Sequence, residues 1–190
     1  MKNINEIEIF KNNKKPLKNL SYDESEYMTE SSLEAIDFDK VKDDHCRALR
    51  LSEVPKSCDA LYQGDEIYFI EFKNGSMSNV RIYEIQKKIY DSIFIFMELT
   101  GFKIVDIRER VNFILVYNKS KVETYLGKSR EIQESESYNR ILRTMSGLAK
   151  INISKFKLRQ FEKYLVKNIY TYTQEEFDEN FIKKYTTIKY

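Results

Sequence analysis

Two charged residues at the end of an apolar segment, with a third charge shortly before it, are the strongest candidates for chemistry in this sequence. Glu71 and Lys73 close the run EIYFIEFK over residues 66–73, and Asp59 precedes that run. Because successive side chains of a strand point to opposite faces, Glu71 and Lys73 share one face. Removing a carboxylate and an ammonium from water is costly. The pair therefore predicts either a buried structural salt bridge or a site that uses both charges.

The spacing of Asp59 and Glu71 predicts that their carboxylates face each other across a β-hairpin. Residues 57–62 and 66–73 are β-rich and flank a short turn around Gly64. One register places Asp59 opposite Glu71, whereas a shift by one residue would place Asp59 on the other face. Two facing carboxylates repel unless a cation lies between them, and Mg²⁺ or Mn²⁺ fits best because these hard ions take oxygen ligands. A neighbouring lysine can orient an attacking water or stabilise charge that develops on a phosphate.

The elements that must position these residues are predicted from periodicity and from helix-ending residues. Apolar residues at three- and four-residue steps predict a helix over about 38–50, and a long apolar helix over 79–100 should end at Gly101. The other expected elements are an edge strand over 4–10, strands over 102–108 and 111–118, and helices over about 131–149, 154–168 and 173–186. This order predicts an α/β fold, with α+β as the alternative, in which helices flank a small mixed β-sheet.

Length and composition favour a single domain over residues 1–190. The chain is 42% hydrophobic and 33% charged, with 5 Gly and 2 Pro, which excludes collagen-like and broadly disordered classes. Cys46 and Cys58 are too few for a disulfide framework and are expected to be packed thiols. The sequence lacks an apolar run long enough for a bilayer, and its N-terminus does not resemble a signal peptide. A cytoplasmic protein without membrane contact is therefore expected.

The net charge of +2 hides two strongly charged segments. Residues 21–44 carry nine acids against two lysines, a net charge of −7, and residues 140–167 carry eight bases against one acid, a net charge of +7. On the expected helix over 154–168, four bases spaced four residues apart would form one stripe. Such a stripe is either a solvated face or a track for a nucleic-acid backbone. Its members are Lys155, Arg159, Lys163 and Lys167.

The order Asp59, eleven further residues, then Glu71-Phe72-Lys73 resembles the D…E-x-K core of the PD-(D/E)XK nuclease superfamily, without the literal Pro-Asp pair. Gln86 and Tyr90 match the Q-x-x-x-Y signature of its RecB-type branch. The resemblance covers about residues 38–118, which implies a restriction-endonuclease-like core followed by a helical extension over about 131–186.

This resemblance also implies roles for individual residues. Asp59 and Glu71 would bind Mg²⁺ or Mn²⁺ together with the main chain near Phe72, and Lys73 would position or activate the water. Gln86 and Tyr90 would shape the catalytic site. The only histidine, His45, would be a further metal ligand, and Glu34 and Glu53 are alternative upstream acids.

The sequence therefore predicts a divalent-metal-dependent nuclease that hydrolyses phosphodiester bonds in DNA or RNA. The alternative is a catalytically inactive protein of the same fold that binds another protein, such as a toxin-neutralising immunity partner. In that case the acidic segment 21–44 would contact a basic partner. If the protein is an enzyme, Mg²⁺ or Mn²⁺ should raise its melting temperature, whereas a binding protein should show no such change.

Overall fold

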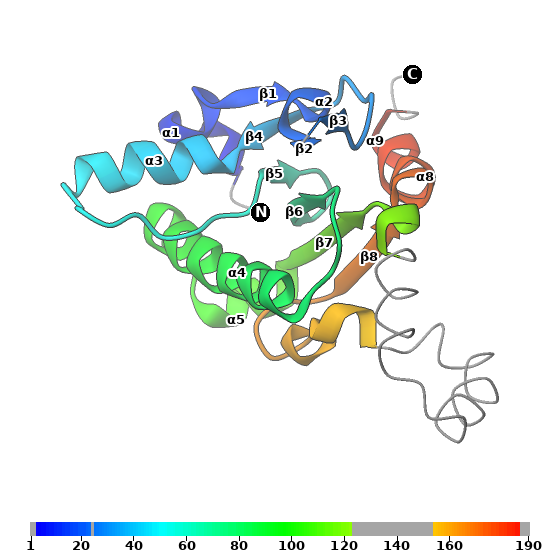
Figure 1. Ribbon diagram of the computed structural model, residues 1–190. Helices are drawn as coiled ribbons and strands as arrows, with labels where there is room; N and C mark the ends of the chain where they lie inside the picture. The colour runs from blue at the N-terminus through cyan, green and yellow to red at the C-terminus, as the bar shows by residue number, and fades with distance from the viewer. Residues whose placement is uncertain (1–2, 24, 123–153, 187–190) are drawn as a thin grey trace.

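The computed structural model describes residues 3–23, 25–122 and 154–186. A six-stranded sheet in the order β1-β4-β5-β6-β7-β8 lies at its centre, with helices on both faces (Figure 1). Neighbours from β1 to β6 are antiparallel, whereas β6, β7 and β8 are parallel. The strands are β1 (Lys14–Pro16), β4 (Glu34–Asp37), β5 (Ala60–Gln63), β6 (Ile67–Lys73), β7 (Val111–Tyr117) and β8 (Ile169–Thr173). This arrangement confirms the predicted α/β fold with a small mixed sheet flanked by helices.

The helical elements divide between the two faces of the sheet, and the two remaining strands form a small sheet of their own. Elements that pack on the first face are η1 (Ile4–Glu6), α1 (Glu8–Lys11), α3 (Phe38–Ala48), α4 (Asn79–Thr100), α5 (Ile104–Arg110), η2 (Ser154–Lys157) and η3 (Arg159–Phe161). Elements that pack on the second face are α2 (Leu17–Leu20), α8 (Gln174–Phe177), η4 (Asp178–Ile182) and α9 (Lys183–Thr186). A separate two-stranded sheet joins β2 (Tyr22–Asp23) to β3 (Glu26–Tyr27).

The central strands are apolar along nearly their whole length because both faces of the sheet are covered. On β6, Phe69 belongs to the core on the α4 side, and Ile70 belongs to the core on the α8 side. Leu115 and Ile114 of β7 divide in the same way. Glu71 is on the same side of β6 as Phe69, so its side chain points into the layer between the sheet and α4.

The long helix α4 has the bounds that the sequence predicts. The Ser78 hydroxyl accepts a hydrogen bond from the Arg81 N–H at its start. Gly101 follows the last turn with φ 72°, in the left-handed region where glycine has no steric penalty. The described residues contain no helix that is both long and apolar enough to cross a membrane.

Two of the predicted strands are wrong. Residues 102–108 contain the start of helix α5, where the Asp106 side chain accepts a hydrogen bond from the Lys103 N–H and Ile107 faces the core. Residues 4–10 form helical turns in η1 and α1, and the edge strand is β1 instead. Alternating polar and apolar residues suggested a strand over 4–10, and β-rich composition suggested one over 102–108, but capping and packing of single apolar residues favour a helical turn in both segments.

The C-terminal part is less helical than predicted. The segment 154–168 forms two short 3₁₀ turns, and Phe156, Lys157 and Lys163 adopt positive φ angles that a continuous helix does not allow. Residues Ile169–Thr173 then add strand β8 to the sheet, so the expected helical extension supplies an edge of the core. The expected helix over 131–149 lies outside the described residues.

The last predicted helix is confirmed. Thr173 and Glu176 form the predicted capping box: the Thr173 hydroxyl accepts from the Glu176 N–H, and the Glu176 carboxylate accepts from the Thr173 N–H. Helical structure then continues through α8, η4 and α9. Cys46 and Cys58 are free and buried, as expected of packed thiols, and burial raises the pKa of both.

Candidate active site

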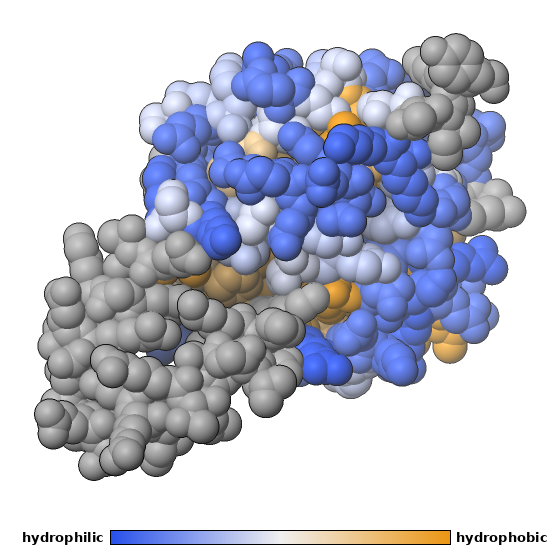
Figure 2. All heavy atoms as spheres, turned by 90° about the vertical axis from the view of Figure 1, so that its right-hand side faces the viewer, coloured by the Kyte–Doolittle hydropathy of each residue, from blue (hydrophilic) through white to orange (hydrophobic). Residues whose placement is uncertain are grey.

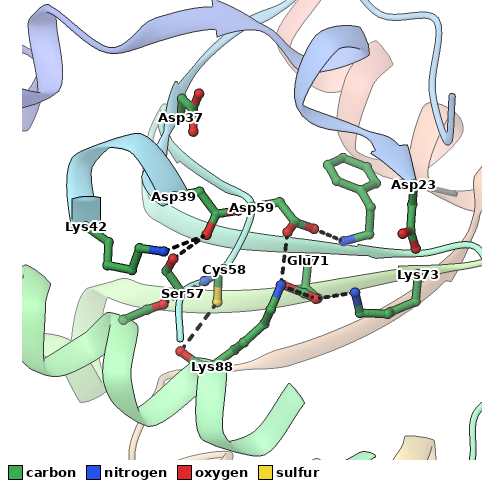
Figure 3. A network of polar contacts seen from close by, with 12 residues as sticks. Asp23, Asp37, Asp39, Lys42, Ser57, Cys58, Asp59, Glu71, Lys73 and Lys88 are labelled. Atoms are coloured by element: carbon green, nitrogen blue, oxygen red, sulfur yellow. Dashed lines mark hydrogen bonds and ion pairs between the residues drawn. The ribbon is translucent and has the colours of Figure 1, made fainter. Parts of the chain in front are cut away.

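Asp59 and Glu71 lie next to each other as the predicted hairpin requires. In the observed register Ala60 pairs with Ile70 and Gln63 pairs with Ile67, so the next position places Asp59 opposite Glu71. Asp59 is further held by the Phe72 N–H, which donates to Asp59 Oδ2 at 2.7 Å. Two carboxylates therefore lie at adjacent positions, that of Glu71 near the carboxyl end of β6 and that of Asp59 directly before β5 (Figure 3).

Two lysines neutralise these carboxylates. Lys88 Nζ, from α4, lies 3.1 Å from Asp59 Oδ1 and 2.8 and 2.9 Å from the two oxygens of Glu71. Lys73 Nζ lies 3.0 Å from Glu71 Oε1. The Glu71 side chain is 0% exposed, which makes these two ammonium groups its necessary counter-charges. Two negative and two positive charges thus form one closed cluster between β6 and α4.

Burial and mutual charge perturb the protonation of this cluster. Burial raises the pKa of Asp59 to about 7, with a further increase from the charge of Glu71, against the opposing effects of Lys88, Lys73 and the Phe72 N–H. Burial lowers the pKa of Lys88 and of Lys73, but the negative charges of Glu71 and Asp59 and the hydrogen bond to Glu71 together outweigh it and raise both. Both lysines therefore remain charged, and Asp59 exchanges a proton near neutral pH.

A polar pocket of about 280 Å³ opens beside Asp59 and Lys73. Asp37 and Asp39, at the start of α3, also line this pocket. Asp37 accepts from the Lys40 N–H at 3.0 Å, caps α3 and pairs with Lys15 Nζ at 2.7 Å. The pocket therefore combines acidic groups from β4, α3 and the start of β5 with a lysine from β6. A larger pocket of about 550 Å³ is lined by Glu34, Tyr62 and Tyr185 and includes none of the four cluster residues.

The structure does not bring the other predicted site residues to this cluster. The Gln86 amide donates to the Lys157 carbonyl at 3.3 Å, and the Tyr90 ring packs edge-on against Phe161. His45 Nε2 lies 3.1 Å from Glu98 Oε2, on the side of α3 that faces α4. Glu34 lies in the larger pocket and Glu53 is exposed. The Q-x-x-x-Y pair thus contacts the 3₁₀ segment rather than the carboxylates.

The predicted basic stripe does not form, because its residues do not share a helix. Arg159 lies in η3 and its guanidinium is 3.9 Å from Glu162. Lys163 lies in an exposed turn with φ 62°. Lys167 forms an ion pair with Glu66, just before the start of β6 and therefore at the opposite end of that strand from Glu71. The Lys155 side chain lies outside the described residues.

The acidic segment 21–44 is likewise distributed over several local contacts. Asp37 and Asp39 line the pocket, Glu30 pairs with Lys18, and Asp44 pairs with Lys40 and Arg47. Asp23 also lines the pocket, and its carboxylate accepts from the Asn74 N–H directly after β6. Part of the segment that the sequence assigned to a protein partner therefore surrounds the candidate site.

Lys88 is the functional candidate that the sequence reasoning missed. It lies one or two helical turns from Ile85, Ser92 and Phe96, which are buried against the sheet. A lysine on the apolar face of a helix is unusual, because its ammonium needs a buried partner. That position was the available signal, because a buried ammonium needs acidic partners and the hairpin predicts Asp59 and Glu71 on the same side of the sheet.

The carboxylate oxygens of the cluster are the kind of ligand that a hard cation prefers, but the cluster offers few of them. Among the described residues, no group of three or more His, Cys, Asp or Glu side chains is placed to hold a metal ion. Two carboxylates are nevertheless enough for Mg²⁺, which commonly keeps several waters and binds one or two carboxylates plus a phosphate. Asp59 and Glu71 already share one cationic partner, the Lys88 ammonium.

Comparison of the chain with protein-family models, with curated proteins and with solved structures finds no match.

Proposed function

We propose that this protein hydrolyses phosphodiester bonds in DNA or RNA with Mg²⁺ or Mn²⁺. The observation that supports this proposal is the convergence of Asp59, Glu71 and Lys73 at the carboxyl end of β6, beside a polar pocket. These are the three residues of the D…E-x-K pattern. A structural salt bridge alone needs one acid and one base, whereas this site places a second carboxylate and a second lysine in the same cluster.

Each residue of the site would have a separate role in hydrolysis. Asp59 and Glu71 would hold the cation, which when bound would lower the pKa of a water and offset charge on the phosphate. Lys73 is positioned to donate hydrogen bonds to that water or to a phosphate oxygen, because its ammonium lies beside Glu71 and lines the pocket. Lys15, half-exposed in the same pocket, supplies a positive charge for the substrate backbone.

The test is a cleavage assay with labelled single- and double-stranded DNA and RNA, in Mn²⁺, in Mg²⁺ and in chelator. We expect cleavage of at least one substrate that depends on the metal and falls about 100-fold or more in Glu71→Gln and Lys73→Met, the lower end of what one acid–base or electrostatic group contributes. Lys87→Met is the matched control, since Lys87 lies on α4 and pairs with Asp91 rather than with the cluster. Full activity of Lys73→Met, or no cleavage of any substrate, would contradict the proposal.

The second candidate is a binding protein that keeps the nuclease-like scaffold without its chemistry. The observation in its favour is the Lys88 ammonium, which lies between the two carboxylates and balances their charge without a metal. This alternative predicts no cleavage and no change in melting temperature with Mn²⁺. A basic protein partner that binds the acidic segment 21–44 would then support it.

A further inference from the structure

We propose that Lys88 is a built-in counter-cation of the candidate active site: its ammonium lies between Asp59 and Glu71 when the site holds no metal, and a divalent cation must displace it to bind. This inference rests on the proposed function, because it concerns how the same two carboxylates receive their metal. It assigns to Lys88 a positioning role that controls metal affinity.

The contacts single out Lys88 rather than Lys73. Lys88 Nζ contacts both carboxylates, with three N···O distances between 2.8 and 3.1 Å. Among the described residues, the ion pair of Lys73 is with Glu71, at 3.0 Å. An ion shared by the two acids would use the same oxygen atoms that Lys88 now occupies, since one oxygen of Asp59 already accepts from the Phe72 N–H. Metal and ammonium therefore compete for one position.

The side chain of Lys88 is able to leave without a movement of its helix. Lysine carries its charge on a flexible four-carbon chain, and the Lys88 side chain is 17% exposed. Its neighbours Ile89 and Ser92 are buried and keep α4 in place. The Ser92 hydroxyl also accepts a hydrogen bond from the Cys58 N–H, directly before Asp59. The helix thus stays attached to the site while the ammonium moves.

Removal of the Lys88 charge should strengthen metal binding and weaken the metal-free fold. In Lys88→Met the four-residue cluster loses one of its two positive charges, so its net charge becomes more negative by one unit. We expect the Mn²⁺ dissociation constant from isothermal titration to fall by about tenfold or more, because one charge at this distance acts through a medium of lower dielectric than water. The metal-free melting temperature should fall, and Mn²⁺ should raise it by more than in the wild type.

Lys87→Met is the matched control. It makes the same substitution one residue earlier, on a side chain that is 48% exposed and contacts Asp91 instead of the cluster. Its Mn²⁺ affinity should equal that of the wild type.

A measurement on the wild type avoids reliance on a variant that fails to fold. Reductive methylation followed by mass spectrometry reports which lysines are free to react. In chelator, the ion pairs should protect Lys88, and saturating Mn²⁺ should increase its labelling several-fold while Lys87 labels equally in both conditions.

The outcomes separate the two proposals. If the wild type binds Mn²⁺ and cleaves nucleic acid, but Lys88→Met binds no more tightly or Lys88 stays protected with Mn²⁺, the counter-cation role is wrong and the nuclease proposal stands. If neither protein binds Mn²⁺ by titration, both proposals are wrong. If Lys88→Met does not fold, the labelling of the wild type decides alone.

Discussion

At the scale of single residues, the site is governed by the cost of burying two carboxylates side by side. Glu71 is fully buried and takes both lysines as partners, whereas Asp59 shares only Lys88 and adds the Phe72 N–H. Burial, together with the neighbouring charge of Glu71, raises the pKa of Asp59 towards neutrality. Because two lysines face two carboxylates in a buried cluster, adding or removing one cation should change the stability of the site.

The raised pKa of Asp59 predicts a specific dependence of stability on pH. Its pKa is about 7 in the folded protein against an ordinary 3.8, so the folded state holds a proton that the unfolded chain has lost. The free energy of unfolding should therefore decrease as pH rises from about 4 to about 7. Asp59→Asn removes this titration and should flatten the slope. Urea unfolding of the wild type and of Asp59→Asn in chelator, at several pH values, measures how the free energy of unfolding depends on pH. Equal slopes for the two proteins would contradict the raised pKa of Asp59.

At the scale of elements, local signals were enough to predict the parts that hold Asp59 and Glu71. The hairpin follows from two β-rich segments around a polar turn, and α4 follows from its periodicity and Gly101. Residues 102–108 could not be assigned correctly, because their β-branched residues suit a strand and only the cap at Asp106 and the packing of Ile107 select a helix. Strand β8 could not be predicted either, since its pairing with β7 is parallel and joins residues far apart in the chain.

The contact between α4 and the start of β5 should matter for both stability and metal binding. The Cys58 N–H donates to Ser92 Oγ at 2.8 Å, and Ser92 is fully buried. Ser92→Ala leaves that N–H without its partner and should cost about 1–3 kcal/mol of unfolding free energy. Because Cys58 precedes Asp59, Mn²⁺ affinity should fall as well.

Ser78→Ala provides the comparison for that prediction. Ser78 caps the other end of α4, and its loss should cost about 1 kcal/mol. It should leave Mn²⁺ affinity unchanged, because Ser78 contacts the Arg81 N–H and not the hairpin. If both variants weaken metal binding equally, α4 acts through general stability rather than through the Ser92 contact.

A second contact between elements attaches the C-terminal helix to the β5–β6 turn. Partial burial raises the pKa of Asp65, but hydrogen bonds from Lys184 and Tyr185 outweigh it and lower the pKa to about 2. A depressed pKa contributes stability above the ordinary value of 3.8, and that contribution disappears as pH falls from about 4 through 2.

Asp65→Asn should therefore lose stability at pH 6 and approach the wild type at pH 2. Glu179→Gln, which removes a fully local pair with Lys183 on the same helical segment, should show little of this effect. Chemical unfolding of the three proteins across this pH range measures the difference. A deficit of Asp65→Asn that persists unchanged at pH 2 would disprove the role of the Asp65 charge.

At the scale of the whole molecule, the described parts of the two charged segments are divided among separate local contacts. Asp37 and Asp39 contribute to the candidate site, and the described basic residues Arg159, Lys163 and Lys167 lie in separate turns. Figure 2 shows the side of the molecule towards which β6 and β7 run: most of its described surface is hydrophilic, with small hydrophobic areas recessed between. The net charge of a segment therefore does not show which of its side chains share a surface in the folded protein.

The sequence predicted the pairing of the two carboxylates because the β5–β6 hairpin depends on a short-range pattern. The sequence did not reveal Lys88, because the ion pair of Lys88 with Glu71 joins α4 to β6. Only the packing of the helix against the sheet shows which helical residue contacts Glu71. The resemblance also suggested Gln86 and Tyr90, which lie on other faces of the same helix.

The most direct test of the central claim is a crystal structure of the wild-type protein with Mn²⁺, with anomalous scattering used to locate the ion. We expect an anomalous peak within coordination distance of both the Asp59 and Glu71 carboxylates, with Lys88 Nζ moved away from Asp59. A structure in which Lys88 still contacts both carboxylates, and in which no Mn²⁺ lies beside them, would contradict the account.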